Sequence, residues 1–77
     1  MSIVEEISTA IAVALPGAQI TVTPAGGGHF SLNVRSETFR GKSMVDSHRL
    51  VMAAIASLMA GDGAPVHAID RLRTETP

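Results

Sequence analysis

Apolar residues recur at helical spacing at the start of the chain. Residues 2–15 carry an apolar stripe that consists of Ile3, Ile7, Ile11 and Ala14. A spacing of three to four residues places these side chains on one face of a helix. Ser2 and Glu5 have the spacing of a capping box, and Pro16 is incompatible with a continuing helix. Residues 2–15 therefore predict an amphipathic helix.

Two segments further on alternate between polar and apolar residues instead. Residues 19–23 and 29–35 both have the period of two that is typical of half-buried strands. The apolar face of the second segment comprises Phe30, Leu32 and Val34. His29 opens the same segment on the opposite face. The glycine-rich residues 24–28 predict a flexible turn between the two strands, and therefore an antiparallel hairpin.

The second half of the chain has a segment with helical spacing of apolar residues, followed by a segment with the pattern of a strand. Residues 44–60 follow Ser43, which is a favourable N-cap, and end before Gly61. Their apolar stripe consists of Met44, Val51, Ile55 and Leu58, widened by Met52 and Met59. Residues 66–72 predict a third strand with imperfect alternation, because Asp70 interrupts its apolar phase.

The resulting order of elements is α-β-β-α-β, which indicates an α+β fold. The helices and the hairpin each have one apolar face, so we expect both helices to cover one face of a three-stranded sheet. The helix over residues 44–60 is long enough to join strands 29–35 and 66–72 in parallel by a right-handed crossover. The sheet is then mixed, its other face is open, and residues 1–77 form a single domain.

The composition restricts the chemistry. Of the 77 residues, 45% are hydrophobic, and the two aromatic residues are Phe30 and Phe39, so the core must be mainly aliphatic. The chain has no cysteine, which excludes disulfides, thiolate metal sites and a cysteine nucleophile. No catalytic constellation or phosphate-binding loop is present, so we do not expect an enzyme.

A net charge of −1 argues against non-specific nucleic-acid binding. The sequence also contains no apolar run of membrane-spanning length and no basic leader, so we expect a cytoplasmic location.

Several short motifs occur in a fixed order from Gly28 onward. They are Gly28-His29-Phe30, Phe39-Arg40-Gly41-Lys42-Ser43, Ser47-His48-Arg49-Leu50-Val51, Pro65-Val66-His67-Ala68-Ile69 and Thr74-Glu75-Thr76-Pro77. No single motif is specific, but the ordered set resembles the BolA-like family. The resemblance implies a type II KH-like fold, which agrees with the order of elements derived above. It also implies that the chain partners a monothiol glutaredoxin in iron–sulfur cluster handling and iron homeostasis.

The resemblance also bears on metal ligands. In the family the histidine that corresponds to His67 is the most consistent cluster ligand. This implies a [2Fe–2S] cluster shared with the partner, and none in the chain alone, which we expect to be a monomer. Imidazole suits iron, and two histidines can replace two thiolates on one iron. If strands 29–35 and 66–72 are parallel neighbours, His29 starts at the same sheet edge as His67 and is the second candidate. The alternative roles are structural, with His67 packing beside Pro65 and His29 facing solvent.

The chain departs from the family pattern at three places. The hairpin loop Pro24–Gly28 is shorter than in many members and carries no histidine or cysteine before His29. Arg71 and Leu72 reverse the usual order of an apolar and then a basic residue. The sequence stops at Pro77, without the tryptophan-containing tail helix of many members.

A KH-like nucleic-acid-binding transcriptional regulator of stress response or cell morphology is the alternative function. In that hypothesis the basic residues Arg35, Arg40, Lys42 and Arg49 contact DNA. In the first hypothesis Arg40, Lys42 and Arg49 contact the protein partner instead. A KH loop is Gly-x-x-Gly, and residues 41–44 lack the second glycine. We therefore favour the adaptor.

A third hypothesis is that the chain is a structural interaction module that binds no metal.

Two further features of the sequence are best explained by a structural role. His48 lies on the apolar side of the helix over residues 44–60, where partial burial is expected. Gly26–Gly28 could cradle an anion through backbone N–H groups, but a flexible turn is the simpler interpretation.

Overall fold

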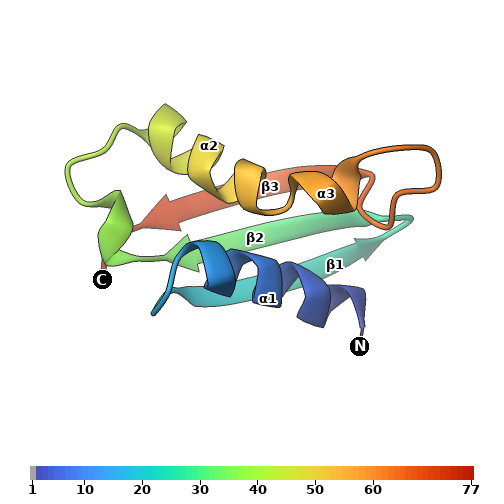
Figure 1. The fold of residues 1–77 in the computed structure, drawn as a ribbon, viewed down its shortest axis with the longest axis horizontal. Coiled ribbons are helices and arrows are strands. Elements are labelled where there is room, and N and C mark those ends of the chain that lie inside the picture. Colours follow the sequence, from blue (N-terminus) through green and yellow to red (C-terminus); the bar gives the residue numbers. More distant parts are fainter. Residues whose placement is uncertain (1) are drawn as a thin grey trace.

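The computed structural model describes residues 2–77, and its element order extends the one expected from the sequence (Figure 1). The elements are α1 (Ile3–Ala14), β1 (Gln19–Gly26), β2 (His29–Arg35), the short 3-10 helix η1 (Glu37–Phe39), α2 (Met44–Ala54), α3 (Ala56–Met59) and β3 (Ala68–Glu75). Both expected N-caps form, because the hydroxyl groups of Ser2 and Ser43 accept hydrogen bonds from backbone N–H groups in the first helical turn.

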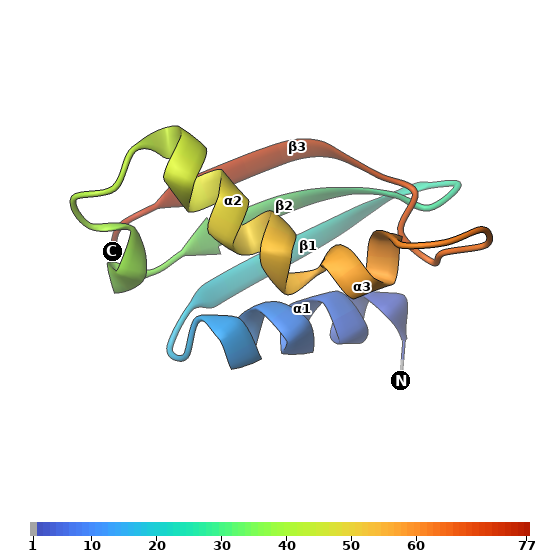
Figure 2. The same ribbon diagram turned by 45° about the horizontal axis from the view of Figure 1, so that its top comes forward.

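The three strands form one mixed sheet in the order β1-β2-β3. Strands β1 and β2 are antiparallel, and β2 and β3 are parallel, so α2 and α3 lie in the crossover between the parallel pair. All three α-helices lie on one side of the sheet, and the opposite face of the sheet is uncovered (Figure 1 and Figure 2). The expected α+β architecture is therefore confirmed.

The core between the helices and the sheet is mainly aliphatic. Its buried members are Ile7, Ile11, Leu15, Phe30, Leu32, Val34, Phe39, Val51, Ile55 and Val66. The central strand β2 contributes three alternating residues to it, as the sequence pattern predicted. Since both phenylalanines belong to this core and the chain has no tyrosine or tryptophan, no ring of these three types remains for the uncovered face of the sheet.

The second predicted helix differs from the observed one in two respects. It breaks at Ile55, whose backbone leaves the α-helical region (φ −108°, ψ 9°) while its side chain is fully buried. Met44 does not join the apolar stripe, because it is 71% exposed beside an open hollow. Ser47 takes the inward position one turn before Val51, and the small side chain is 3% exposed.

The third strand is displaced from the range expected for it. It covers Ala68–Glu75 rather than residues 66–72, and Val66 is buried in the segment before it. The register with β2 passes from Phe30↔Ile69 to Ser31↔Arg71, so Asp70 is an extra residue in the ladder. Such a β-bulge adds one residue to a strand and shifts its alternation. The bulge explains the imperfect pattern in the sequence.

The hairpin turn is tighter than the flexible loop that the sequence suggested. Strand β1 continues to Gly26, and only Gly27 and Gly28 separate it from β2. Both glycines have positive φ angles, 63° and 79°. Two residues with positive φ form the type I′ turn that matches the twist of paired strands.

Candidate functional site

The first candidate ligand, His67, is fixed by its backbone next to the hairpin turn. Its N–H donates to the carbonyl oxygen of Gly28 at 2.8 Å, and the N–H of Ala68 reaches the same oxygen at 3.3 Å. The imidazole lies directly against Gly28, because a Cβ atom on that glycine would be 2.9 Å from Cγ of His67. His67 itself is exposed to solvent. The absence of a side chain at position 28 therefore makes room for this ring.

The second candidate, His29, opens strand β2 on the uncovered face of the sheet. Its Nδ1 lies 2.7 Å from Oδ1 of Asp70, and both side chains are about half exposed, at 47% and 46%. An ionised carboxylate only accepts hydrogen bonds, so Nδ1 carries the proton and donates it. In the neutral ring, Nε2 then keeps its lone pair. Metal-binding histidines are commonly oriented by a carboxylate in this way.

The two histidines flank the same turn. His29 pairs with Ala68, the residue after His67, and β2 and β3 start at the same edge of the sheet, as expected. On the other side of the turn, a Cβ atom on Gly27 would be 3.9 Å from Cδ2 of His29. Within residues 2–77 no group of three or more histidine, aspartate or glutamate side chains is arranged to hold a metal ion. The chain thus presents a pair of imidazoles with one supporting carboxylate.

Asp70 is the residue of this site that the sequence reasoning did not identify as functional. Its signal was present, because it interrupts the apolar phase of the third strand. That interruption reflects the bulge, which leaves Asp70 without a partner in the β2 ladder. The side chain can therefore reach His29, where its Oδ1 lies 2.7 Å from Nδ1.

The basic residues considered for DNA or partner binding come from several elements, and two of them line the same hollow. The guanidinium of Arg40 makes two hydrogen bonds to Glu37, at 2.7 and 2.9 Å. This pairing lowers the pKa of Glu37 and raises the pKa of Arg40. Arg49 lies 3.8 Å from Asp46 and shares with Lys42 an open hollow of about 310 Å³. Each of these arginines is thus accompanied by a carboxylate.

The remaining residues of interest occupy separate positions. Arg35 ends β2 opposite Glu75, its Cα partner in β3. His48 is half-buried on α2, in agreement with the partial burial expected there. Gly41 and Lys42 belong to the turn that leads to the Ser43 cap of α2.

Comparison with known proteins now identifies the family. The family model described as BolA, BolA-like protein, matches residues 4–77, and the chain therefore belongs to the BolA-like family. No curated protein matches the chain.

Solved structures agree with this assignment. The bolA protein homologue from Coxiella burnetii is 32% identical, with a TM-score of 0.78 over 100% of this chain and 94% of that one. BolA1 from Mus musculus is 30% identical, with a TM-score of 0.77 over 100% of this chain and 67% of that one. BolA1 from Arabidopsis thaliana has a TM-score of 0.82 over 100% of this chain and 94% of that one, and its 20% identity makes it a likeness of fold.

Proposed function

We propose that this chain is an adaptor that binds a monothiol glutaredoxin and contributes histidine ligands to a [2Fe–2S] cluster held between the two proteins. Membership of the BolA-like family supports the general role. The observation that carries the specific proposal is the pair of imidazoles beside the Gly27–Gly28 turn, one of them backed by a carboxylate. The cluster is the cargo of this adaptor, not its resident cofactor.

The chemistry of the donors fits a shared cluster. Imidazole nitrogens can replace thiolates on one iron of a two-iron cluster. This chain has no cysteine, so the thiolate ligands must come from the partner. His67 can supply its ring without rearrangement of the sheet, because its backbone is hydrogen-bonded to Gly28. In His29 the hydrogen bond to Asp70 occupies Nδ1 and so leaves Nε2 as the ligand atom.

The decisive experiment mixes the chain anaerobically with a cluster-loaded monothiol glutaredoxin. We expect the wild-type chain to change the visible absorption and EPR spectra to those of histidine-ligated iron. H67A should still bind the glutaredoxin, because a protein interface is far larger than one side chain. It should lose the new spectral features. H29A should weaken them.

Matched variants separate ligand loss from loss of structure. H48A should lower the melting temperature and leave the cluster spectrum unchanged, because His48 is half-buried on α2. D70N keeps the size of the side chain but removes the charge that orients His29, so it should weaken the cluster less than H29A does. The proposal fails if H67A assembles a cluster with the wild-type spectrum, or if only H48A disturbs it.

A nucleic-acid-binding role has less support. Arg40 and Arg49 are both close to carboxylates, and Lys42 shares its hollow with Asp46. Phosphate binding at these positions would have to compete with those contacts. We therefore retain the adaptor as the function of this chain.

A further inference from the structure

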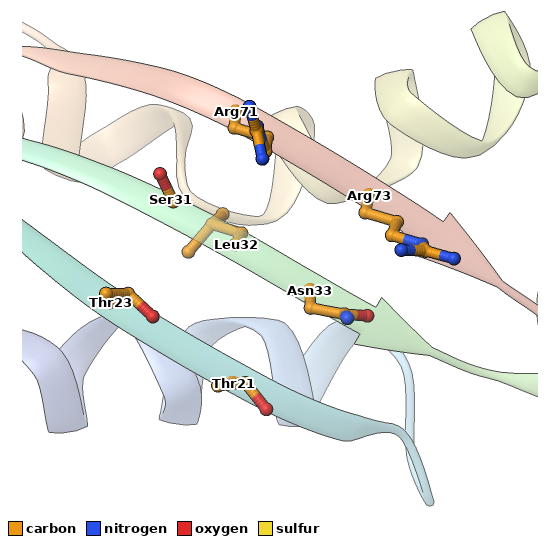
Figure 3. A pocket seen from close by; sticks show the side chains of 7 residues that line it. All are labelled: Thr21, Thr23, Ser31, Leu32, Asn33, Arg71 and Arg73. Atoms are coloured by element: carbon orange, nitrogen blue, oxygen red, sulfur yellow. The ribbon is translucent and has the colours of Figure 1, made fainter.

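The uncovered face of the sheet carries an ordered array of hydrogen-bond donors. The register aligns two rows across the three strands. One row is Thr23, Ser31 and Arg71, and the other is Thr21, Asn33 and Arg73. The six side chains surround a shallow hollow of about 200 Å³, with the helices behind the sheet (Figure 3). We call these six residues the donor trough.

The two arginines of the trough are available for an external ligand. Among the side chains of residues 2–77, no carboxylate lies within 4.0 Å of either guanidinium. Of the two acidic residues in β3, Asp70 is hydrogen-bonded to His29, and Glu75, two residues after Arg73, is the Cα partner of Arg35. Arg71 and Arg73 are exposed. Arg40 differs from them, because Nε and Nη2 of its guanidinium already donate hydrogen bonds to the two carboxylate oxygens of Glu37.

The bulge at Asp70 produces this arrangement. It lets Ile69 and Leu72 both pair with inward residues of β2, Phe30 and Leu32. Arg71 and Arg73 are consequently opposite Ser31 and Asn33 on the outward face. Positions two apart in a strand are separated by about 6.6 Å, since the rise is about 3.3 Å per residue. The trough therefore presents two arginines whose backbone positions have the spacing of alternate residues in an extended chain.

The shape of the trough indicates what it binds. A small free anion would stay largely hydrated on such an open surface and would meet only one arginine well. A single-stranded nucleic acid would need aromatic rings for its bases to stack on. Both aromatic residues are buried in the core. An extended peptide with carboxylates at alternate positions matches the spacing of the two arginines along β3. Each arginine can then form a bidentate ion pair with one carboxylate.

We propose that the donor trough docks an extended acidic segment of a partner protein, with carboxylates at positions i and i+2 paired with Arg71 and Arg73. Ser31, Asn33 and the two threonines donate further hydrogen bonds to its backbone and side chains. This inference goes beyond the adaptor role, because no trough residue is a candidate cluster ligand. A partner that reaches His29 would approach the same face of the sheet.

The test is an NMR titration of the full chain with a synthetic capped peptide of alternating glutamate and serine. We expect the amides of Ser31, Asn33, Arg71 and Arg73 to shift, and R71Q/R73Q to bind at least about tenfold more weakly than wild type. R71K/R73K keeps the charge but loses the planar fork, so its affinity should be intermediate. R49Q is the control for loss of a positive charge elsewhere, since it removes one guanidinium from α2 and should bind like wild type.

Two further probes test spacing and ligand class. A peptide of the same composition with its glutamates in one block should bind at least about threefold more weakly. A single-stranded oligothymidylate of equal charge should bind more weakly than the alternating peptide. The proposal is overturned if the wild-type chain shows no shifts at millimolar peptide, if R71Q/R73Q binds like R49Q, or if the block peptide or the oligonucleotide binds as well as the alternating peptide. None of these variants alters a proposed cluster ligand, so this outcome is independent of the cluster experiment.

Discussion

At the scale of single residues, the contact between His67 and Gly28 determines where the candidate ligand sits. The glycine serves two purposes, because its φ of +79° forms the turn and its missing side chain admits the imidazole. Gly27 shares the positive φ but has a wider clearance to its neighbour. The two adjacent glycines therefore allow the two effects to be separated.

G28A should destabilise the protein and displace the ring of His67. An alanine with positive φ costs about 1 kcal/mol or more, and the added Cβ would also be 2.9 Å from Cγ of His67. G27A is the control, since its Cβ would lie 3.9 Å from Cδ2 of His29 and the variant would incur only the backbone cost. Urea denaturation gives the stability, and NMR gives the shift of the His67 ring protons. Equal ring shifts in G27A and G28A would contradict this account.

At the scale of elements, the break between α2 and α3 lets the crossover follow the sheet. Ile55 lies at the break with a fully buried side chain, and Val51 precedes it by one turn on the same side. Local helix propensity favours an unbroken helix through the alanine-rich sequence, so burial of Ile55 outweighs that propensity. The same competition shapes β3, where the bulge at Asp70 lets Ile69 and Leu72 both pack against the core.

I55A should lower the free energy of unfolding by about 2–5 kcal/mol, the usual cost of cutting a buried isoleucine to alanine. The side chain is 0% exposed, so the surrounding residues must leave a cavity or collapse into it. V13A is the matched control on α1, because Val13 is 76% exposed and its truncation should change stability by no more than about 0.5 kcal/mol. Denaturant unfolding measures both. Similar losses in the two variants would show that Ile55 does not anchor the break.

At the scale of the whole molecule, charge is dispersed over separate surfaces. The chain carries 6 basic and 7 acidic residues. The pairs Arg40–Glu37 and Arg49–Asp46 lie away from the two arginines of the donor trough. None of the helices formed by residues 2–77 has the length and apolar character needed to cross a membrane. A polyanion would consequently meet the basic residues as separate groups, with Arg71 and Arg73 on the uncovered face of the sheet.

Binding to duplex DNA should be weak, with a shallow dependence on salt. Of the four basic residues considered for DNA, only Arg35 and Lys42 make no direct ion pair with a carboxylate within the described part of the chain. Contacts from these two residues alone would neutralise about two phosphates and give a slope of log K against log salt of about −2. Fluorescence anisotropy across a salt series measures it, and R35Q/K42Q should reduce the slope further. Tight, sequence-specific binding at physiological salt would favour the regulator over the adaptor.

The sequence alone was sufficient for the type and order of the main elements and for the sheet topology, but not for the break in the second helix or the bounds of β3. Hydrophobic periodicity, helix caps and helix-breaking residues depend only on neighbouring residues in the sequence. The helix from Ile3, the hairpin strands and the strand around Leu72 can therefore be predicted from them. The parallel pairing of β2 and β3 follows from the length of the crossover. That pairing brings the starts of both strands, and with them His29 and His67, to one edge.

Contacts between residues distant in sequence decided the rest. The register of β3 against β2 determines that Asp70 is the bulged residue, so it also determines that Asp70 meets His29 and that Arg71 faces outward. Alternation within one strand cannot reveal this, because an extra residue is defined only relative to the partner strand. The exposure of Met44 likewise depends on where α2 lies over the sheet, which no periodicity within the helix determines.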